Sequence, residues 1–517
     1  MNYNEFLESK QRIPPACGFD KPKEEMNPLL FEWQKDIVRW ALKKGRAALF
    51  EECGNGKTIQ QLEFCRCVSE HTGQPALIAA PLTVAEQTRR EGAKFGYEVT
   101  LCRRQEDVRP GINVTNYEML DHFDASVFGA VVLDESSIIK NYMGKVRNQI
   151  IEMFQNVPYR LSCTATPSPN DYMELGNQVE FLGIMSRTEM LATFFTHDGS
   201  NTSQWRLKGH AETRFWEWVA TWAVVLTCPG DLGYPNDGYI LPELRMHEHL
   251  VRCRNLMDRG LFGWVAQTLT ERRDARRMSL QERCEKAAEL VASAPEEQWI
   301  IWCDLNDESA MLTGMIAGSV EVRGTDKPEE KASALRSFAD GYIRYLVTKP
   351  SIAGFGVNWQ QCHNMIFVGL SDSYEAMYQS IRRCYRFGQE YPVNVHIVTS
   401  AAEGAVKANV ERKEAQAAAM KQNMVQYTKE ILTREIHGTE RIVIPYEPAV
   451  EMPDYRTLVT TLARSGDICE LCANRKTLML DDCEDADCDC AICKSGCECA
   501  RCENGSNFVW RISHGKA

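Results

Sequence analysis

Residues Glu51 to Thr58 read EECGNGKT and stand between the apolar run Ala47 to Phe50 and a helix-like stretch from Ile59 to Val68. A strand that ends in a glycine-bearing turn before a helix can point backbone N–H groups at an anion. The positive end of the helix dipole adds to this attraction. The segment therefore predicts a loop for the phosphates of a nucleoside triphosphate, ATP, and we call it the phosphate loop.

Five residues of the phosphate loop carry the predicted contacts. Gly54, Asn55 and Gly56 would lie around the phosphates, where glycine lets the backbone approach without a Cβ. Lys57 would place its charge on the β- and γ-phosphates, and Thr58 would offer its hydroxyl to Mg²⁺. The loop opens with an acid where the general pattern has glycine, so the loop alone leaves an ordinary glycine turn as the alternative.

Composition limits the class of protein. The chain has 517 residues, 44% of them hydrophobic and 25% charged, which predicts two large globular domains and a smaller third part. The N-terminus has no apolar signal core, and no run reaches the roughly 18 apolar residues that span a bilayer. We therefore expect a cytoplasmic protein with no membrane contact. A net charge of −12 excludes a uniformly basic surface, although a local groove of Lys and Arg could still hold a phosphate backbone.

A helical pattern from Pro28 to Leu42 precedes the phosphate loop. Its Gln34 can both donate and accept hydrogen bonds and so could bind an adenine edge, with Phe31 or Trp33 against the ring. The alternative is a solvated glutamine on an amphipathic helix. Gln34 is thus a candidate ATP-binding residue.

Alternating strand-like and helical runs follow the phosphate loop. Strands are predicted at Ala76 to Ala80, Ile112 to Tyr117 and Ala130 to Leu133, with a helix at Thr83 to Gly92. This order is typical of a parallel sheet that binds ligands at its strand ends.

Two acids, Asp134 and Glu135, come directly after the last of these strands. The first would hold Mg²⁺ and the second would orient or deprotonate the attacking water. A hydroxyl-rich turn, Thr164 to Pro167, follows the next strand and could couple the nucleotide to a moving part.

The second half repeats the pattern without a phosphate loop. Strand-like runs occur at Gln298 to Cys303, Val320 to Val322, Tyr345 to Thr348 and Met365 to Val368, and helices are expected at Ser309 to Ile316, at Glu329 to Phe338 and, as one long helix, at Ala401 to Leu432. We expect a second parallel sheet that serves the nucleotide of the first from across a cleft.

Several segments together resemble a known family. The order FEWQ, EECGNGKT, APLTVAEQ, VTNYE, LDESS and TATP resembles the first RecA-like domain of superfamily 2 helicases, and the acid at the start of the loop is similar to the Swi/Snf-type branch. The paired arginines that this branch commonly shows before its Leu-Pro are absent before Leu241-Pro242. The whole resembles the compact helicases of tailed phages.

The resemblance also assigns residues in the second half. TKPSIAGFGVN resembles motif V, which implies that Gly354 and Gly356 approach the nucleotide. QSIRRCYRFGQ resembles motif VI, which makes Gln379 a nucleotide-binding residue and Arg383 and Arg386 the arginine fingers that stabilise a transferring phosphoryl group. The alternative is that the three arginines of this segment lie solvated on one helix.

The expected fold is α/β, with two RecA-like parallel-sheet domains in tandem and a cleft between them. We place the first at 1–245, with a connector from about 180, and the second at 246–437. A linker at 438–466 and a cysteine-rich module at 467–517 follow.

Nine cysteines gather in that last module, in a stretch too poor in core-forming residues to fold without metal or disulfides. They are Cys469, Cys472, Cys483, Cys488, Cys490, Cys493, Cys497, Cys499 and Cys502. Eight of them would complete two four-sulfur Zn²⁺ sites, with an iron–sulfur cluster or disulfides as rivals. The acidic residues between them favour a protein partner over DNA.

Three functions fit these observations. The first is an ATP-driven translocase on nucleic acid, and the family resemblance favours duplex DNA. The second is a helicase that separates DNA or RNA strands, although its aromatic-rich connector reads as packing rather than as a wedge. The third is a nucleotide-gated binding protein whose tail recruits a partner. The complete set of ATPase residues favours a motor.

Overall fold

The structure is a computed structural model of the chain. It describes residues 18–437 except 142, 170, 199–200, 253–273, 275, 354–357, 372 and 401–403. The predicted linker at 438–466, the nine cysteines of the tail and the motif V glycines Gly354 and Gly356 lie outside the described residues.

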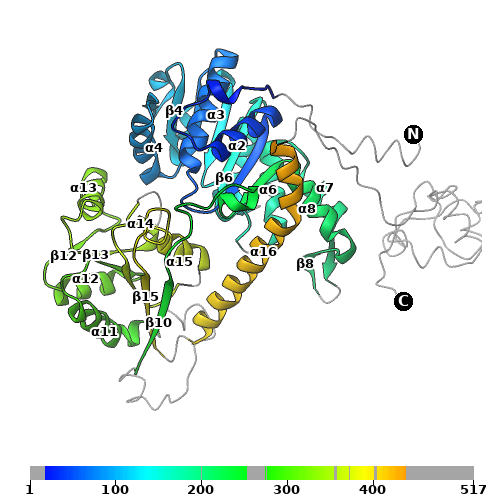
Figure 1. Cartoon of the computed structure of the whole chain (residues 1–517). Helices are drawn as coiled ribbons and strands as arrows, with labels where there is room; N and C mark the ends of the chain where they lie inside the picture. Colours follow the sequence, from blue (N-terminus) through cyan, green and yellow to red (C-terminus); the bar gives the residue numbers. More distant parts are fainter. Residues whose placement is uncertain are drawn as a thin grey trace, which may run out of the picture. The chain divides into compact units, whose positions relative to one another are not determined.

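A seven-stranded parallel sheet forms the first half, with strand order β3-β4-β2-β5-β6-β1-β9. Figure 1 labels its strands β4 and β6. Its strands are β1 (Arg46–Glu51), β2 (Ala76–Ala80), β3 (Val99–Leu101), β4 (Ile112–Asn116), β5 (Ala130–Asp134), β6 (Tyr159–Thr164) and β9 (Ala223–Leu226). Every residue of β2, β4 and β6 is buried. Strands buried on both faces are near-continuous apolar runs, which is why the sequence shows them so clearly.

Helices accompany this sheet. They are α2 (Glu32–Lys44), α3 (Lys57–Thr72), α4 (Leu82–Lys94), α5 (Lys145–Phe154), α6 (Leu175–Leu182), α7 (Arg187–Phe194) and α8 (Glu212–Ala220). Short 3-10 turns also occur, among them η5 (Ser136–Lys140) and η8 (Pro229–Leu232). α3 begins directly after Gly56, so its positive end lies at the phosphate loop.

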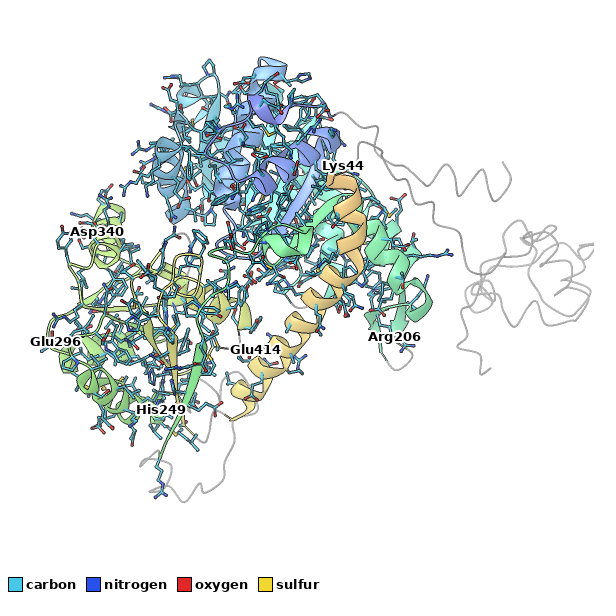
Figure 2. The ribbon with its side chains drawn as sticks, viewed as in Figure 1. Lys44, Arg206, His249, Glu296, Asp340 and Glu414 are labelled. Atoms are coloured by element: carbon cyan, nitrogen blue, oxygen red, sulfur yellow. The ribbon has the colours of Figure 1, made fainter. Side chains whose placement is uncertain are left out.

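A six-stranded parallel sheet forms the second half, with strand order β10-β15-β14-β11-β13-β12. Its strands are β10 (Leu244–Val251), β11 (Trp299–Cys303), β12 (Ser319–Glu321), β13 (Tyr345–Thr348), β14 (Asn364–Val368) and β15 (Val393–Ser400). β10 is an edge strand that carries His249 near its end, and the Nε2 of His249 lies 3.0 Å from the Nδ1 of His396 on β15 (Figure 2).

The helices of this half are α11 (Leu280–Ser293), α12 (Asn306–Met315), α13 (Pro328–Ala339), α14 (Pro350–Ala353), α15 (Tyr374–Ile381) and α16 (Gly404–His437). The long α16 packs against α2, α8 and β9 of the first half and also contacts α15 (Figure 1). No helix in the described ranges combines the length and the apolar character that crossing a bilayer requires.

Residues Thr196–His210 belong to a unit separate from the rest of the described chain. Within the described part of that unit, β7 (Phe195–Asp198) and β8 (Asn201–Leu207) pair as a two-stranded sheet.

Three features differ from the sequence-based expectation. The predicted connector contains β9, an edge strand of the first sheet, and the second sheet gains β10 and β15, which were not predicted. The three arginines of the motif VI segment are not on one helix, because α15 ends at Ile381 and the arginines follow in turns.

One prediction about the connector is confirmed. Its aromatic residues Phe215, Trp216 and Trp222 are buried, as their predicted packing role requires.

Candidate functional site

The phosphate loop has the backbone that the sequence predicts. Gly54 has φ 99° and Gly56 has φ 79°, a region that favours glycine. A Cβ on Gly56 would lie 2.5 Å from the Nε2 of Gln34, so any larger residue there would displace Gln34. The Nζ of Lys57 donates to the carbonyl oxygens of Glu51 at 2.7 Å and Glu52 at 3.2 Å. The lysine is therefore held over the loop, where it can meet a phosphate.

Gln34 is buried beside this loop. Its Nε2 donates to the carbonyl oxygen of Asn55 at 2.9 Å, and its Oε1 accepts from the backbone N–H of Phe31 at 3.0 Å. In this structure the amide fastens α2 to the phosphate loop. Binding of an adenine edge by Gln34 stays a prediction.

Four aromatic rings meet next to Gln34. The ring centroid of Tyr239 lies 4.8 Å from that of Phe387, 5.8 Å from that of Trp33 and 6.4 Å from that of Phe31. Phe387 also covers the loop, because a Cβ on Gly54 would lie 3.0 Å from the Phe387 backbone nitrogen. Sequence reasoning named Phe31 and Trp33 but missed Tyr239 and Phe387, since only the fold brings them together.

Asp134 and Glu135 stand at the carboxyl end of β5, next to β6 and one strand further from β1 in the sheet order. The Oδ1 of Asp134 accepts from the Nε2 of Gln61 at 2.9 Å, and the Oε1 of Glu135 accepts from the hydroxyl of Thr164 at 2.7 Å. Burial raises the pKa of both acids, and the charge of Lys57 partly offsets this. The Thr164 contact ties the hydroxyl-rich turn to the acid.

Glu135 has φ 58° and is the only non-glycine residue with positive φ in the described ranges. A left-handed backbone at such a residue costs on the order of 1–3 kcal/mol and persists only where the surroundings impose it. The cost is consistent with a side chain that is aimed for a function.

The donor set at this edge fits Mg²⁺. Asp134 offers a carboxylate whose charged form burial disfavours, which a cation would compensate, and Thr58 at the start of α3 offers a hydroxyl. These two residues would hold the ion, which when bound neutralises charge on the phosphates. No group of three or more His, Cys, Asp or Glu in the described ranges could hold a metal by itself.

The second half supplies the remaining predicted residues. The Nε2 of Gln379 on α15 donates to the Oε1 of Glu135 at 3.3 Å. Arg383 is buried, and burial lowers its pKa to about 10, with the charge of Glu135 opposing that shift. The Nη1 of Arg386 donates to the Oδ1 of Asn358. The fold thus brings Gln379 and Arg383 to Glu135, whereas Arg386 contacts Asn358 of its own half.

Further links between the halves were not predicted. The Nδ2 of Asn358 donates to the Oε1 of Glu91 on α4 at 3.2 Å, so Arg386 connects through Asn358 to the first half. Glu375 on α15 pairs with Lys140 and accepts from the hydroxyl of Thr166 at 3.4 Å. Charged residues are common on surfaces, so no local pattern indicates that these would pair across the site.

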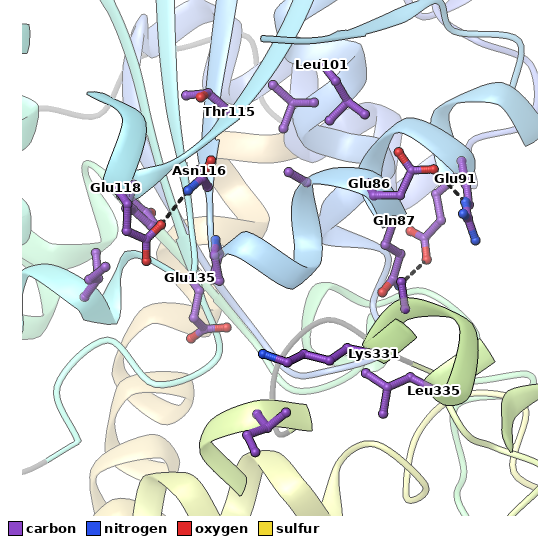
Figure 3. A pocket seen from close by; sticks show the side chains of 18 of the residues that line it. Glu86, Gln87, Glu91, Leu101, Thr115, Asn116, Glu118, Glu135, Lys331 and Leu335 are labelled. Carbon is purple, nitrogen blue, oxygen red and sulfur yellow. Dashed lines mark hydrogen bonds and ion pairs between the residues drawn. The ribbon is translucent and has the colours of Figure 1, made fainter. Parts of the chain in front are cut away.

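A groove of about 1160 Å³ runs between the two halves and reaches Glu135 (Figure 3). Glu86, Gln87 and Glu91 of α4 line one side, and Lys331 of α13 extends into it from the other. The lining also includes cations and acids in similar number: Arg90, Lys94, Arg103, Lys140 and Arg336, and Glu118, Glu135, Glu329 and Glu375. The groove therefore has room for an extended ligand next to the nucleotide site, with Lys94, Arg103 and Arg336 as the cations of its wall that could meet an anion.

This arrangement can perform phosphoryl transfer to water. Lys57 and the loop amides would bind the phosphates, Glu135 would orient the water, and Arg383 and Arg386 would stabilise the charge that develops. Acid and arginines belong to different halves, so the site is complete only when the halves are together.

Comparison with known proteins identifies two family models in the chain. Residues 33–202 match the SNF2-related domain, and residues 282–388 match the Helicase conserved C-terminal domain. Together they span just over half of the 517 residues.

Curated relatives match shorter stretches. The chain is 26% identical over 175 residues to the Chromodomain-helicase-DNA-binding protein 3 homolog of Caenorhabditis elegans, a match that covers 26% of this chain and 10% of the relative. It is 26% identical over 191 residues to the TATA-binding protein-associated factor 172 of Homo sapiens, a match that covers 30% of this chain and 10% of that relative. It is 24% identical over 208 residues to the CHD3-type chromatin-remodeling factor CHR7 of Arabidopsis thaliana, covering 35% and 17%. The matched region is thus a small part of these relatives.

Among solved structures, the Sulfolobus solfataricus SWI2/SNF2 ATPase core in complex with dsDNA is 18% identical, with a TM-score of 0.38, and the match covers 80% of this chain and 97% of that one. None of these proteins bears on the resemblance to phage helicases, which stays a prediction. With the SNF2-related domain, which contains the phosphate loop, followed by the Helicase conserved C-terminal domain, the chain belongs to the Swi/Snf-type branch of superfamily 2, a family of ATP-hydrolysing enzymes.

Proposed function

We propose that this chain is an ATP-driven motor that moves along duplex DNA without separating long stretches of it. One observation carries the proposal. Glu135 of the first sheet accepts a hydrogen bond from Gln379 of the second at 3.3 Å, and Arg383 lies buried where the charge of Glu135 acts on it. Hydrolysis is therefore linked to the approach of the two halves, as a motor requires.

The groove between the halves is the proposed binding surface for the DNA backbone. Lys94 on α4 and Arg103 after β3 belong to the first half, and Arg336 on α13 belongs to the second. Their side chains form no hydrogen bond or ion pair with another residue in the described part of the chain. Three such cations can take phosphates without breaking protein contacts. A backbone that binds both halves would be shifted when they separate and close.

Duplex DNA is the preferred substrate for two reasons. The relatives are named as a helicase-DNA-binding protein and a chromatin-remodeling factor, although they share only part of their length with this chain. In addition, the connector aromatics Phe215, Trp216 and Trp222 are buried, so these three rings are not available as a wedge between strands. A motor without a wedge moves on a duplex and displaces what is bound to it.

The test is ATP turnover with single-stranded DNA, duplex DNA, forked DNA and RNA. We expect the strongest stimulation by duplex DNA and displacement of a third strand, with poor unwinding of long blunt duplexes. Efficient unwinding by the isolated chain would promote the strand-separating helicase instead. Turnover that no nucleic acid stimulates would favour a nucleotide-gated binding protein.

A salt titration tests the groove. DNA binding should weaken with salt because phosphate contacts release counterions. Lys94→Ala and Arg336→Ala should each reduce the slope of log affinity against log salt by about one. Lys286→Ala is the matched control, since Lys286 pairs with Glu289 on α11 and does not line the groove.

The cysteine-rich tail would bind zinc and a protein partner, a proposal that rests on the sequence alone. Elemental analysis should give about two zinc ions per chain. Iron with visible absorbance, or no metal, would contradict it. Removal of the tail after Arg464 should leave basal turnover intact, because every residue assigned to ATP precedes Glu390.

A further inference from the structure

Glu52, the second acid of the phosphate loop, is buried and receives contacts from three elements. Its Oε1 accepts from the backbone N–H of Cys53 at 2.9 Å and from the hydroxyl of Tyr378 on α15. The Nη2 of Arg382, which follows α15, lies 2.7 Å from the same oxygen. Lys421 of α16 forms an ion pair with Oε2. One buried carboxylate thus pairs with two cations, Arg382 just after α15 and Lys421 on α16.

Arg382 fixes the segment that bears the predicted fingers. Its Nη1 donates to the carbonyl oxygen of Tyr385 at 3.1 Å, and its guanidinium lies 5.8 Å from the ring centre of Tyr378 and 5.4 Å from that of Tyr385. Arg383 is the next residue. The contact with Glu52 therefore sets the backbone position from which Arg383 extends.

The two cations differ in the half to which they are attached. Arg382 belongs to the second sheet's layer, whereas Lys421 lies on α16, which packs along α2, α8 and β9 of the first half. When the halves separate, α15 would carry Arg382 away from the loop and α16 would keep Lys421 at Glu52. A buried carboxylate left without a partner is strongly destabilising, because nothing replaces the hydration that it has lost.

We propose that Lys421 is a positioning residue that keeps Glu52 neutralised when the site opens, and that it thereby sets how readily product leaves. Arg382 and Lys421 pair with different oxygens of Glu52, and Lys421 alone would still compensate its charge once Arg382 has moved away, so Lys421 stabilises the open state relative to the closed one. This inference rests on the proposed ATP hydrolysis by the same site.

Opposite effects on ADP distinguish the two cations. Lys421→Met keeps an apolar stem in place and removes the charge. Only Arg382 then compensates the charge of Glu52, so the closed state becomes more stable relative to the open one. ADP should bind about fivefold tighter or more, and kcat and KM should fall together because product release slows. Arg382→Ala should lower kcat without tighter ADP binding.

Two variants serve as controls. Lys421→Arg keeps the charge and should restore the ADP affinity of the unchanged protein. Lys429→Ala removes an exposed lysine from the same helix and should change neither kcat nor ADP affinity.

Equilibrium titration with a fluorescent ADP analogue decides the proposal without turnover. Tighter binding by Lys421→Met and unchanged binding by Lys421→Arg would support it. Unchanged or weaker binding by Lys421→Met would overturn it. Failure of the unchanged protein to hydrolyse ATP would instead contradict the proposed function, so the two failures can be told apart.

Discussion

The strand-to-helix junctions after β1 and after β11 both expose backbone N–H groups that can bind an anion. They differ in what accepts those hydrogen bonds. After β11, the Oε2 of Glu308 accepts from the backbone N–H groups of Asp304 at 2.8 Å and Leu305 at 2.9 Å. The Nη1 of Arg283 pairs with the Oε1 of Glu308 at 2.7 Å, and both side chains are fully buried. The second sheet thus fills its anion position with its own carboxylate.

After β1 the chain fills the junction differently. The phosphate loop has glycine at 54 and 56, and Lys57 lies over the backbone carbonyls of the loop. Glu52 accepts from the backbone N–H of Cys53, but no acid in the described part of the chain takes the N–H groups of Gly54, Gly56 or Lys57, so these can take phosphate. The comparison shows that a parallel sheet offers an anion position at its strand ends by geometry. Whether a ligand can use it depends on one local side chain.

The largest expected effect is on ATP turnover and comes from the junction after β1, whose loop can bind phosphate. Lys57→Ala should abolish ATP turnover because it removes the charge on the β- and γ-phosphates. Glu135→Gln should still bind ATP and hydrolyse it slowly. Steady-state turnover and equilibrium nucleotide binding measure both. Turnover of Glu135→Gln at the unchanged rate would remove the water-orienting role from Glu135.

The next effect concerns what the second sheet contributes instead of a phosphate loop. Arg383→Ala or Arg386→Ala should reduce the hydrolysis rate on the order of 10³-fold, with little loss of ATP binding. Single-turnover kinetics and nucleotide titration separate the two quantities. A loss of affinity with an unchanged rate for bound ATP would make that arginine a ground-state ligand.

A change at the junction after β11 should alter the free energy of unfolding rather than ATP turnover. Glu308→Ala leaves Arg283 buried without its partner, so the free energy of unfolding should fall by about 3–5 kcal/mol. Denaturant unfolding measures it. Glu289→Ala on the same α11 layer breaks only an exposed pair with Lys286 and should cost less than about 1 kcal/mol. Equal effects of the two variants would contradict the comparison.

The smallest effect concerns Glu51 at the end of β1. Burial raises its pKa to about 7, with Lys57 and a hydrogen bond from Gln60 opposing the shift. A raised folded pKa means stability that is fully present below the unfolded value near 4.5 and is lost as pH rises through 7. Glu51→Gln should remove this loss, on the order of 2 kcal/mol at higher pH. Thermal unfolding between pH 4.5 and 8 measures it, and identical profiles would contradict the assignment.

Much of the fold could be predicted from local pattern. β2, β5 and β14 are continuous apolar runs, because a strand buried on both faces must be apolar along its length. β10 was missed because it is an edge strand, LRMHEHLV, that alternates and carries charged residues. β15 was missed because Asn394 and His396 interrupt its apolar run, although the neighbouring β14 and β10 make it a central strand.

The sequence by itself determined the chemistry within each segment: the phosphate loop, the two acids after β5 and the arginines after α15. Their identity depends on neighbours along the chain, and spacing is enough to show it. Tertiary structure alone decided which acid each cation meets. Glu52 with Arg382 and Lys421, and Glu308 with Arg283, depend on how helices far apart in sequence pack. Pairing of charges is a property of position in space, and surface and buried acids look the same in a sequence.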